Sequence, residues 1–270
     1  MYGTISRATT LLSSSSRLAN GVLSGRIDVD PRSRTDAEYL PWDPNGRYGG
    51  ICGSYYVGDI PRREHVPIVF VHGNTADATD WLPLMERFLD RGDTGEDLWG
   101  ITFRRASPSH DSMVGQLDNF VKRVREHTGH DAVHVVAHSL GVTGVRYWLD
   151  QRNRYSWVDS FVGIAGANHG SGLCQHLDRS RVPLPNGAVR FLNPSHLERP
   201  DHPLARLNQN ETPGDVDYYT IRAPKDRFFP DNPTSPTLAG ATNVTVPGSH
   251  DGLLDQDATF DHLAAWLRGD

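Results

Sequence analysis

Residues 133–141, with the sequence Val-His-Val-Val-Ala-His-Ser-Leu-Gly, join an apolar, strand-like run to a serine between small residues. Ala137 and Gly141 lie two positions before and two positions after Ser139, and helix-compatible sequence follows at once. This pattern is typical of a nucleophile elbow, a strained strand-to-helix turn that lifts the serine Oγ clear of the sheet. The common form has glycine in the first small position, and Ala137 departs from it by one methyl group. Ser139 is therefore the candidate nucleophile.

A serine nucleophile needs a general base and an acid that orients this base. His250 lies in a Gly/Ser-rich loop between the last expected strand, residues 243–246, and the last expected helix. Asp226 follows the preceding expected strand, residues 216–221, so the chain order is serine, aspartate, histidine. Proteins with a nucleophile elbow use this order. We therefore expect Ser139, Asp226 and His250 to form a catalytic triad.

Two other aspartates remain alternatives for the acid. Asp251 adjoins His250, where local geometry makes the orientation of a triad acid awkward. Asp231 lies beyond a Phe-Phe-Pro segment. The sequence favours Asp226, because the acid must reach the imidazole Nδ1 from the loop that follows the penultimate strand.

An oxyanion hole is expected from two backbone amides. Residues 66–71 form a continuous apolar run that is followed by His-Gly-Asn. In an elbow site one donor comes from the loop after such a strand, and the other from the residue after the nucleophile. We therefore expect the N–H groups of Asn74 and Leu140 to form the hole. His72 and His138 flank the site without a carboxylate at the expected place, and we interpret them as structural.

Strand-like and helix-like segments alternate along most of the chain. Apolar residues recur at helical spacing between Met113 and Val124, which predicts an amphipathic helix with one buried face. Strands alternating with such helices predict an α/β fold, with a mostly parallel central sheet and helices on both faces. The expected strands are residues 66–71, 98–103, 133–138, 157–165, 216–221 and 243–246.

The chain divides into an arm and a single domain. Residues 1–48 are rich in Ser, Arg, Asp and Gly with little periodicity, and we expect a loosely structured N-terminal arm. Residues 49–270 are expected to form one domain. Within it, residues 168–214 are too long for a plain connection between elements. This insertion lies between the strand that follows the candidate nucleophile and the strand that precedes the candidate acid, so we expect it to overhang the site as a lid or binding wall.

The motifs together resemble the α/β-hydrolase fold of the class 2 bacterial lipases. Residues 70–74, residues 136–141, the loop that holds Asp226 and residues 248–254 carry the resemblance, which covers residues 66–268. The chain also resembles polyhydroxyalkanoate depolymerases of that fold. The resemblance implies a carboxylic ester hydrolase of the lipase or esterase type that uses the triad named above. It also implies export from the cell.

Composition limits the classes of partner. The net charge is −6 at pH 7 with both signs interspersed, so no nucleic-acid partner is expected. No apolar stretch approaches the roughly 18 residues of a membrane helix, so no stable membrane anchor is expected. The first 20 residues lack the apolar core of a signal peptide. Cys52 and Cys174 permit either one disulfide or two free thiols.

The expected reaction is hydrolysis through an acyl-enzyme by a monomer, without metal or cofactor. The expected substrate is a small-molecule or lipid ester. One alternative is a polyester, which would need exposed aromatic residues such as Trp81 or those of the insertion. A second alternative is a catalytically inactive binding module on a hydrolase scaffold. The histidines of the insertion do not show the paired spacing of metal ligands; these are His169, His176, His196 and His202.

Overall fold

The computed structural model describes residues 49–51, 65–93, 97–179 and 188–269. The predicted N-terminal arm, residues 1–48, lies outside the described residues. Cys52, one of the two cysteines, also lies outside them, and Cys174 is a free thiol whose pKa burial raises to about 11.

A seven-stranded sheet in the order β1-β3-β2-β4-β5-β6-β7 forms the centre of the described chain. β1 pairs antiparallel with β3, and the other neighbouring strands pair in parallel. The predicted mostly parallel sheet is therefore confirmed. The strands are β1 Gly49–Ile51, β2 Ile68–Val71, β3 Leu98–Thr102, β4 Val133–His138, β5 Val158–Ile164, β6 Asp217–Arg222 and β7 Thr242–Thr245.

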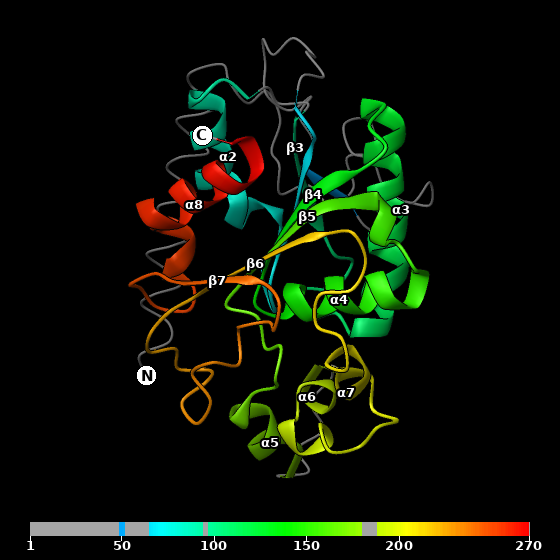
Figure 1. Ribbon diagram of the computed structural model, residues 1–270, viewed down its shortest axis with the longest axis vertical. Coiled ribbons are helices and arrows are strands. Elements are labelled where there is room, and N and C mark those ends of the chain that lie inside the picture. The colour runs from blue at the N-terminus through cyan, green and yellow to red at the C-terminus, as the bar shows by residue number, and fades with distance from the viewer. Residues whose placement is uncertain (1–48, 52–64, 94–96, 180–187, 270) are drawn as a thin grey trace.

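Helices cover both faces of this sheet, as predicted. Figure 1 shows α2 and α8 on one side of the sheet and α3 and α4 on the other, and the two helices of each pair contact each other. No described helix combines the length and the apolar character that crossing a bilayer requires. The helices outside the insertion are η2 Ala78–Trp81, α2 Leu82–Asp90, α3 His110–Thr128, α4 Leu140–Arg152, η4 Tyr155–Trp157, η6 Gly252–Asp255 and α8 Asp257–Arg268.

The segment predicted as an insertion, residues 168–214, contains short helices. They lie together at one end of the molecule, beyond α4 (Figure 1), and the last of them contacts α4. The helices are α5 Gly172–Arg179, α6 Ala188–Phe191, η5 Pro194–His196 and α7 Pro203–Leu207.

Helix α3 shows how the sequence pattern produces the packing. Ser109 caps its N-terminus by accepting a hydrogen bond from the Ser112 N–H, and Gly129 ends it in the left-handed conformation with φ of 77°. The predicted apolar face is fully buried, which confirms the amphipathic helix. Its members are Met113, Leu117, Phe120, Val121 and Val124.

Helix α4 begins directly after β4 and passes very close to the end of β2. A Cβ atom on Gly141 would lie 2.6 Å from the carbonyl oxygen of His72 and 2.8 Å from that of Val71. Real Cβ atoms do not approach backbone oxygens so closely, so only glycine allows this packing. The contact fixes the first turn of α4 relative to the loop that follows β2.

We predict that Gly141→Ala destabilises the protein by at least about 1–3 kcal/mol, because the new methyl group must displace backbone rather than a side-chain end. Gly115→Ala is the matched control. Gly115 lies on the exposed face of α3, and a Cβ atom there would meet nothing within 4 Å. We expect this second change to stabilise the helix by about 0.5–1 kcal/mol. Urea unfolding of both variants measures the difference, and equal stabilities would contradict the packing argument.

Candidate active site

Ser139 lies between β4 and α4 in a strained backbone conformation. Its φ is 53° and its ψ is −120°, a region that residues with side chains rarely occupy. Such strain costs of the order of 1–3 kcal/mol and persists only when surrounding contacts enforce it. Here the Ser139 N–H donates to the Ile164 carbonyl at 2.9 Å, and the Val142 N–H donates to the Ser139 carbonyl at 3.1 Å. The predicted elbow therefore has the expected strained geometry.

The structure brings Ser139, His250 and Asp226 into one hydrogen-bonded chain. His250 Nε2 lies 2.8 Å from Ser139 Oγ, and His250 Nδ1 lies 2.6 Å from Asp226 Oδ2. An ionised carboxylate can only accept, so Nδ1 carries the proton and Nε2 is free to accept from the serine hydroxyl. Both His250 and Asp226 are buried, which shields the chain from water. This arrangement can remove the proton from Ser139.

Asp226 is held on both carboxylate oxygens. While Oδ2 faces His250, Oδ1 accepts a hydrogen bond from the Phe228 N–H at 2.8 Å. The other two candidate aspartates are exposed and engaged elsewhere. Asp251 pairs with Arg227 at 3.2 Å, and Asp231 lies beside Gly172 at the start of α5. Of the three aspartates, Asp226 is the one in contact with His250 Nδ1.

The two amides predicted for the oxyanion hole lie on segments that border Ser139. A Cβ atom on Gly73 would lie 3.0 Å from the Cβ of Ser139, so the loop after β2 passes directly against the elbow. Asn74 follows in this loop, and Leu140 is the first residue of α4. Neither N–H donates a hydrogen bond to another described residue. The amino-terminal end of a helix also favours negative charge, so this edge suits an anion.

Aromatic rings enclose His250. The Phe228 ring lies 4.3 Å from the His250 ring and is half-buried, whereas Phe229 lies 6.0 Å away and is buried. His138 packs 4.9 Å away, and its Nε2 donates to the His250 carbonyl at 3.1 Å. Burial, together with the neighbouring His250, lowers the pKa of His138 to about 4. His138 is therefore a neutral donor that holds the backbone of His250.

The sequence pattern predicted His72 and His138 as structural residues that flank the site, and both contact backbone groups of the site. Their position in the sequence was the available signal, because His138 precedes Ser139 directly and His72 lies two residues before Asn74. Their partners are main-chain groups distant in sequence, such as the His250 carbonyl for His138 and the Phe103 N–H for His72. A pattern of residue types does not reveal such partners.

Two groups of described side chains are close enough to share a cation. In the first, His138, His250 and Asp251, the ring nitrogens of His250 already face Asp226 and Ser139. The second group is His65, Asp93 and Asp97, where Arg268 donates to Asp93 at 2.6 and 2.8 Å. An arginine thus already supplies positive charge to Asp93. Neither group has the arrangement of a dedicated metal site.

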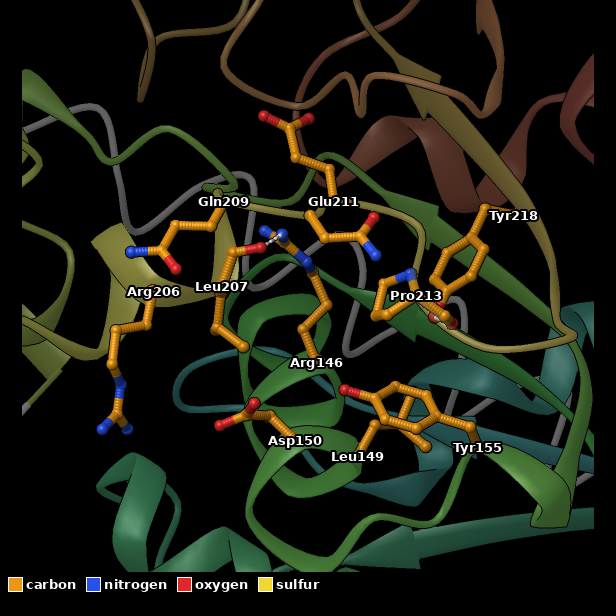
Figure 2. Close-up of a pocket in the computed structure, with 11 residues that line it drawn as sticks. Arg146, Leu149, Asp150, Tyr155, Arg206, Leu207, Gln209, Glu211, Pro213 and Tyr218 are labelled. Atoms are coloured by element: carbon orange, nitrogen blue, oxygen red, sulfur yellow. Dashed lines mark hydrogen bonds between the residues drawn. The ribbon is translucent and has the colours of Figure 1, made fainter. Parts of the chain in front are cut away.

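The insertion is fastened to α4 by a buried arginine. Arg146 donates to the Leu207 carbonyl at 2.9 Å, to Asn208 Oδ1 at 3.1 Å and to Asn168 Oδ1 at 3.2 Å. Burial lowers its pKa to about 10, so it remains charged at neutral pH. Figure 2 shows its guanidinium reaching Leu207 at the edge of a cavity of about 170 Å³. None of the candidate triad residues lines this cavity.

The sheet order, the elbow and the hydrogen-bonded serine, histidine and aspartate define an α/β-hydrolase. The sequence profile of the class 2 lipases matches residues 65–261. The chain therefore belongs to the class 2 lipase family, and it is a carboxylic ester hydrolase.

Solved structures agree with this fold. The mature form of Bacillus licheniformis lipase BlEst2 is 20% identical with a TM-score of 0.60, and the match covers 75% of this chain and 92% of that one. The match to the propeptide form of the same lipase covers 75% of this chain and 50% of that one. Aspergillus fumigatus lipase B is 14% identical with a TM-score of 0.60, over 91% of this chain and 64% of that one. These identities are low, so the likeness shows the fold.

Because three histidines are buried in the neutral form, we predict that acid destabilises the protein. Burial lowers the pKa of His134 and His138 to about 4 and that of His110 to about 3. An unfolded histidine has a pKa of about 6.5, so below this pH the unfolded chain binds protons that the folded chain does not. The free energy of unfolding should be highest above about pH 6.5 and fall as the pH drops toward 4. Each histidine contributes up to about 1.4 kcal/mol per pH unit.

Urea unfolding at pH 7.5, 6.0 and 5.0 measures this loss. His134→Leu is the informative variant, because His134 Nδ1 is buried without a hydrogen-bond partner among the described residues. The variant removes one titrating group, so its stability should fall less between pH 7.5 and 5.0 than that of the wild type. Identical slopes for the two proteins would contradict the assignment of His134 as a neutral buried histidine.

Proposed function

We propose that Ser139, His250 and Asp226 carry out the ester hydrolysis of this class 2 lipase through an acyl-enzyme. The observation that supports this most strongly is the pair of hydrogen bonds through His250, at 2.8 Å to Ser139 and 2.6 Å to Asp226. A serine with only a structural role in a turn does not require a buried imidazole that is oriented toward its hydroxyl. The same two contacts disfavour an inactive binding module.

In the proposed first step, Ser139 Oγ attacks the ester carbonyl while His250 Nε2 takes the hydroxyl proton. The imidazolium then gives this proton to the oxygen of the departing alcohol, and the acyl group remains on Ser139. Asp226 keeps Nδ1 protonated and stabilises the imidazolium while it exists. Water then attacks the acyl-enzyme by the same proton transfers and releases the carboxylic acid.

The N–H groups of Asn74 and Leu140 are proposed to bind the oxygen that becomes negative in each tetrahedral intermediate. Their position beside Ser139 and the lack of other acceptors among the described residues support this role. Removing one such donor typically reduces kcat about 10²–10³-fold.

The proposed substrate is a small-molecule or lipid ester. A polyester substrate would need an open surface with exposed aromatic residues, and Trp81 is fully buried. The insertion is proposed to form one wall of the binding site, since the Ser171 hydroxyl, just before α5, donates to the Phe228 carbonyl at 2.6 Å. Phe228 in turn touches the His250 ring. One chain supplies each of these groups, which supports catalysis by a monomer.

We predict that Ser139→Ala abolishes hydrolysis of p-nitrophenyl butyrate while the protein stays folded. The loss of a nucleophilic serine in a comparable triad lowers kcat on the order of 10⁶-fold. Alanine relieves none of the backbone strain and removes only Oγ, so circular dichroism should be unchanged. Activity within tenfold of the wild type would place the nucleophile elsewhere.

The three aspartates give a separate prediction. Asp226→Asn should lower kcat by about 10⁴-fold with little change in KM, because an amide at this position no longer selects the productive tautomer of His250. Asp231→Asn and Asp251→Asn are matched controls that remove one exposed carboxylate each. Steady-state kinetics on all three variants should leave the controls within a few-fold of the wild type. A larger loss in either control than in Asp226→Asn would reassign the acid.

A further inference from the structure

His72 follows β2 and is buried, with a main-chain group on each ring nitrogen. The Phe103 N–H donates to Nε2 at 3.0 Å, and Nδ1 lies 2.7 Å from the Gly73 carbonyl oxygen. Because an N–H can only donate, Nε2 must be unprotonated. The ring proton is then on Nδ1, which donates to the Gly73 carbonyl. The contacts of the ring thus fix its tautomer.

The Gly73 carbonyl shares one planar peptide unit with the N–H of Asn74. In a trans peptide the carbonyl and the N–H point in opposite directions, and the described residues contain no cis bond. Anchoring the Gly73 oxygen therefore sets the direction of the Asn74 N–H. A hydrogen bond to the oxygen also polarises the amide, which makes its N–H a stronger donor.

The next peptide is anchored independently. The Thr75 N–H donates to the Ala106 carbonyl at 2.6 Å, and Thr75 has a positive φ of 61°. Phe103 and Ala106 both belong to the connection between β3 and α3, so this connection supports the loop at two points. Asn74 lies between the two anchored peptides. Gly73 passes so close to the elbow that a Cβ atom there would lie 3.2 Å from His138 Nδ1.

From these contacts we propose that His72 is a positioning residue for the reaction: its Nδ1–H holds the Gly73–Asn74 peptide so that the Asn74 N–H faces the developing oxyanion. The proposal rests on the function proposed above for Asn74. In this proposal His72 acts through its main-chain partners and not by contact with the ester. Its effect is transmitted through one peptide bond, and it should affect the transition state more than the bound substrate.

Two variants of His72 separate its two hydrogen bonds. Asparagine places an amide nitrogen near the position of Nδ1, so His72→Asn can still donate to the Gly73 carbonyl. Glutamine places its amide near Nε2, so His72→Gln can accept from the Phe103 N–H but cannot hold Gly73. We expect kcat to fall less than about tenfold in His72→Asn. In His72→Gln we expect a fall of about 10²–10³-fold, the cost of losing one oxyanion donor, with KM within threefold.

Butaneboronic acid provides a readout that a structural role would not change. It forms a tetrahedral adduct with the serine Oγ, so its inhibition constant should rise in His72→Gln by a factor similar to the fall in kcat/KM. His134→Gln is the matched control, since it replaces another buried histidine, on the strand next to β2. We expect it to lower stability and to leave kcat and boronate inhibition unchanged.

Equal losses in His72→Asn and His72→Gln, or a change in KM alone, would overturn the proposal. A test on the wild type covers the case in which a variant does not fold. The ¹⁵N shifts of the His72 ring, in enzyme labelled at histidine, should show a proton on Nδ1, and a proton on Nε2 would overturn the proposal. Failure of the proposed function has a different signature, because it would appear as retained activity in Ser139→Ala.

Discussion

The strained, positive-φ backbone of Ser139 is the constraint on which the rest of the site depends. A serine with φ of 53° is held in place only if neighbouring chain segments approach closely on several sides. The close approach requires glycine at position 141, where a Cβ atom would collide with the end of β2, and a Cβ atom at position 73 would be tightly packed at 3.0 Å from the Cβ of Ser139. The tight packing around the elbow thus involves two glycines that are distant in the sequence.

The order of the strands explains how distant residues meet. β2, β4, β5 and β6 are neighbours in that order and run in parallel, so the loops at their carboxyl ends share one edge of the sheet. Asn74 follows β2, Ser139 follows β4, and Asp226 follows β6. α/β sheets bind ligands at this edge because it collects the loops and the amino-terminal ends of helices. The sheet fixes the relative positions of these loops, and the loops provide the functional groups.

The fold was predictable because strands and helices leave periodic patterns of apolar residues. The buried stripe of α3 and the apolar runs of β2 and β4 could be read directly, and with them the parallel sheet. The chain order of serine, aspartate and histidine likewise required only motifs and their sequence. Asp226 could be preferred to Asp231 and Asp251 from its place after a strand, but the contact with His250 that separates them required coordinates.

Other features had no pattern to reveal them. Arg146 holds the insertion by donating to the main-chain oxygen of Leu207 and to the side-chain oxygens of Asn208 and Asn168. These partners lie far along the chain and have no characteristic spacing. From the sequence alone, Arg146 is therefore indistinguishable from any other polar residue of a helix. Its burial still has a consequence. A buried arginine held by three acceptors is costly to separate from them, so the attachment of the insertion to α4 is firm.

The roles of the site histidines follow from the chemistry of their partners. His250 has a carboxylate on Nδ1, and a carboxylate stabilises the positive charge that a general base acquires. His138 donates from Nε2 to a backbone carbonyl, while its burial favours the neutral ring and lowers its pKa to about 4. A second cation 4.9 Å from His250 would oppose formation of the imidazolium. A neutral His138 can therefore hold the backbone of His250 as a hydrogen-bond donor without opposing the proton transfer proposed for His250.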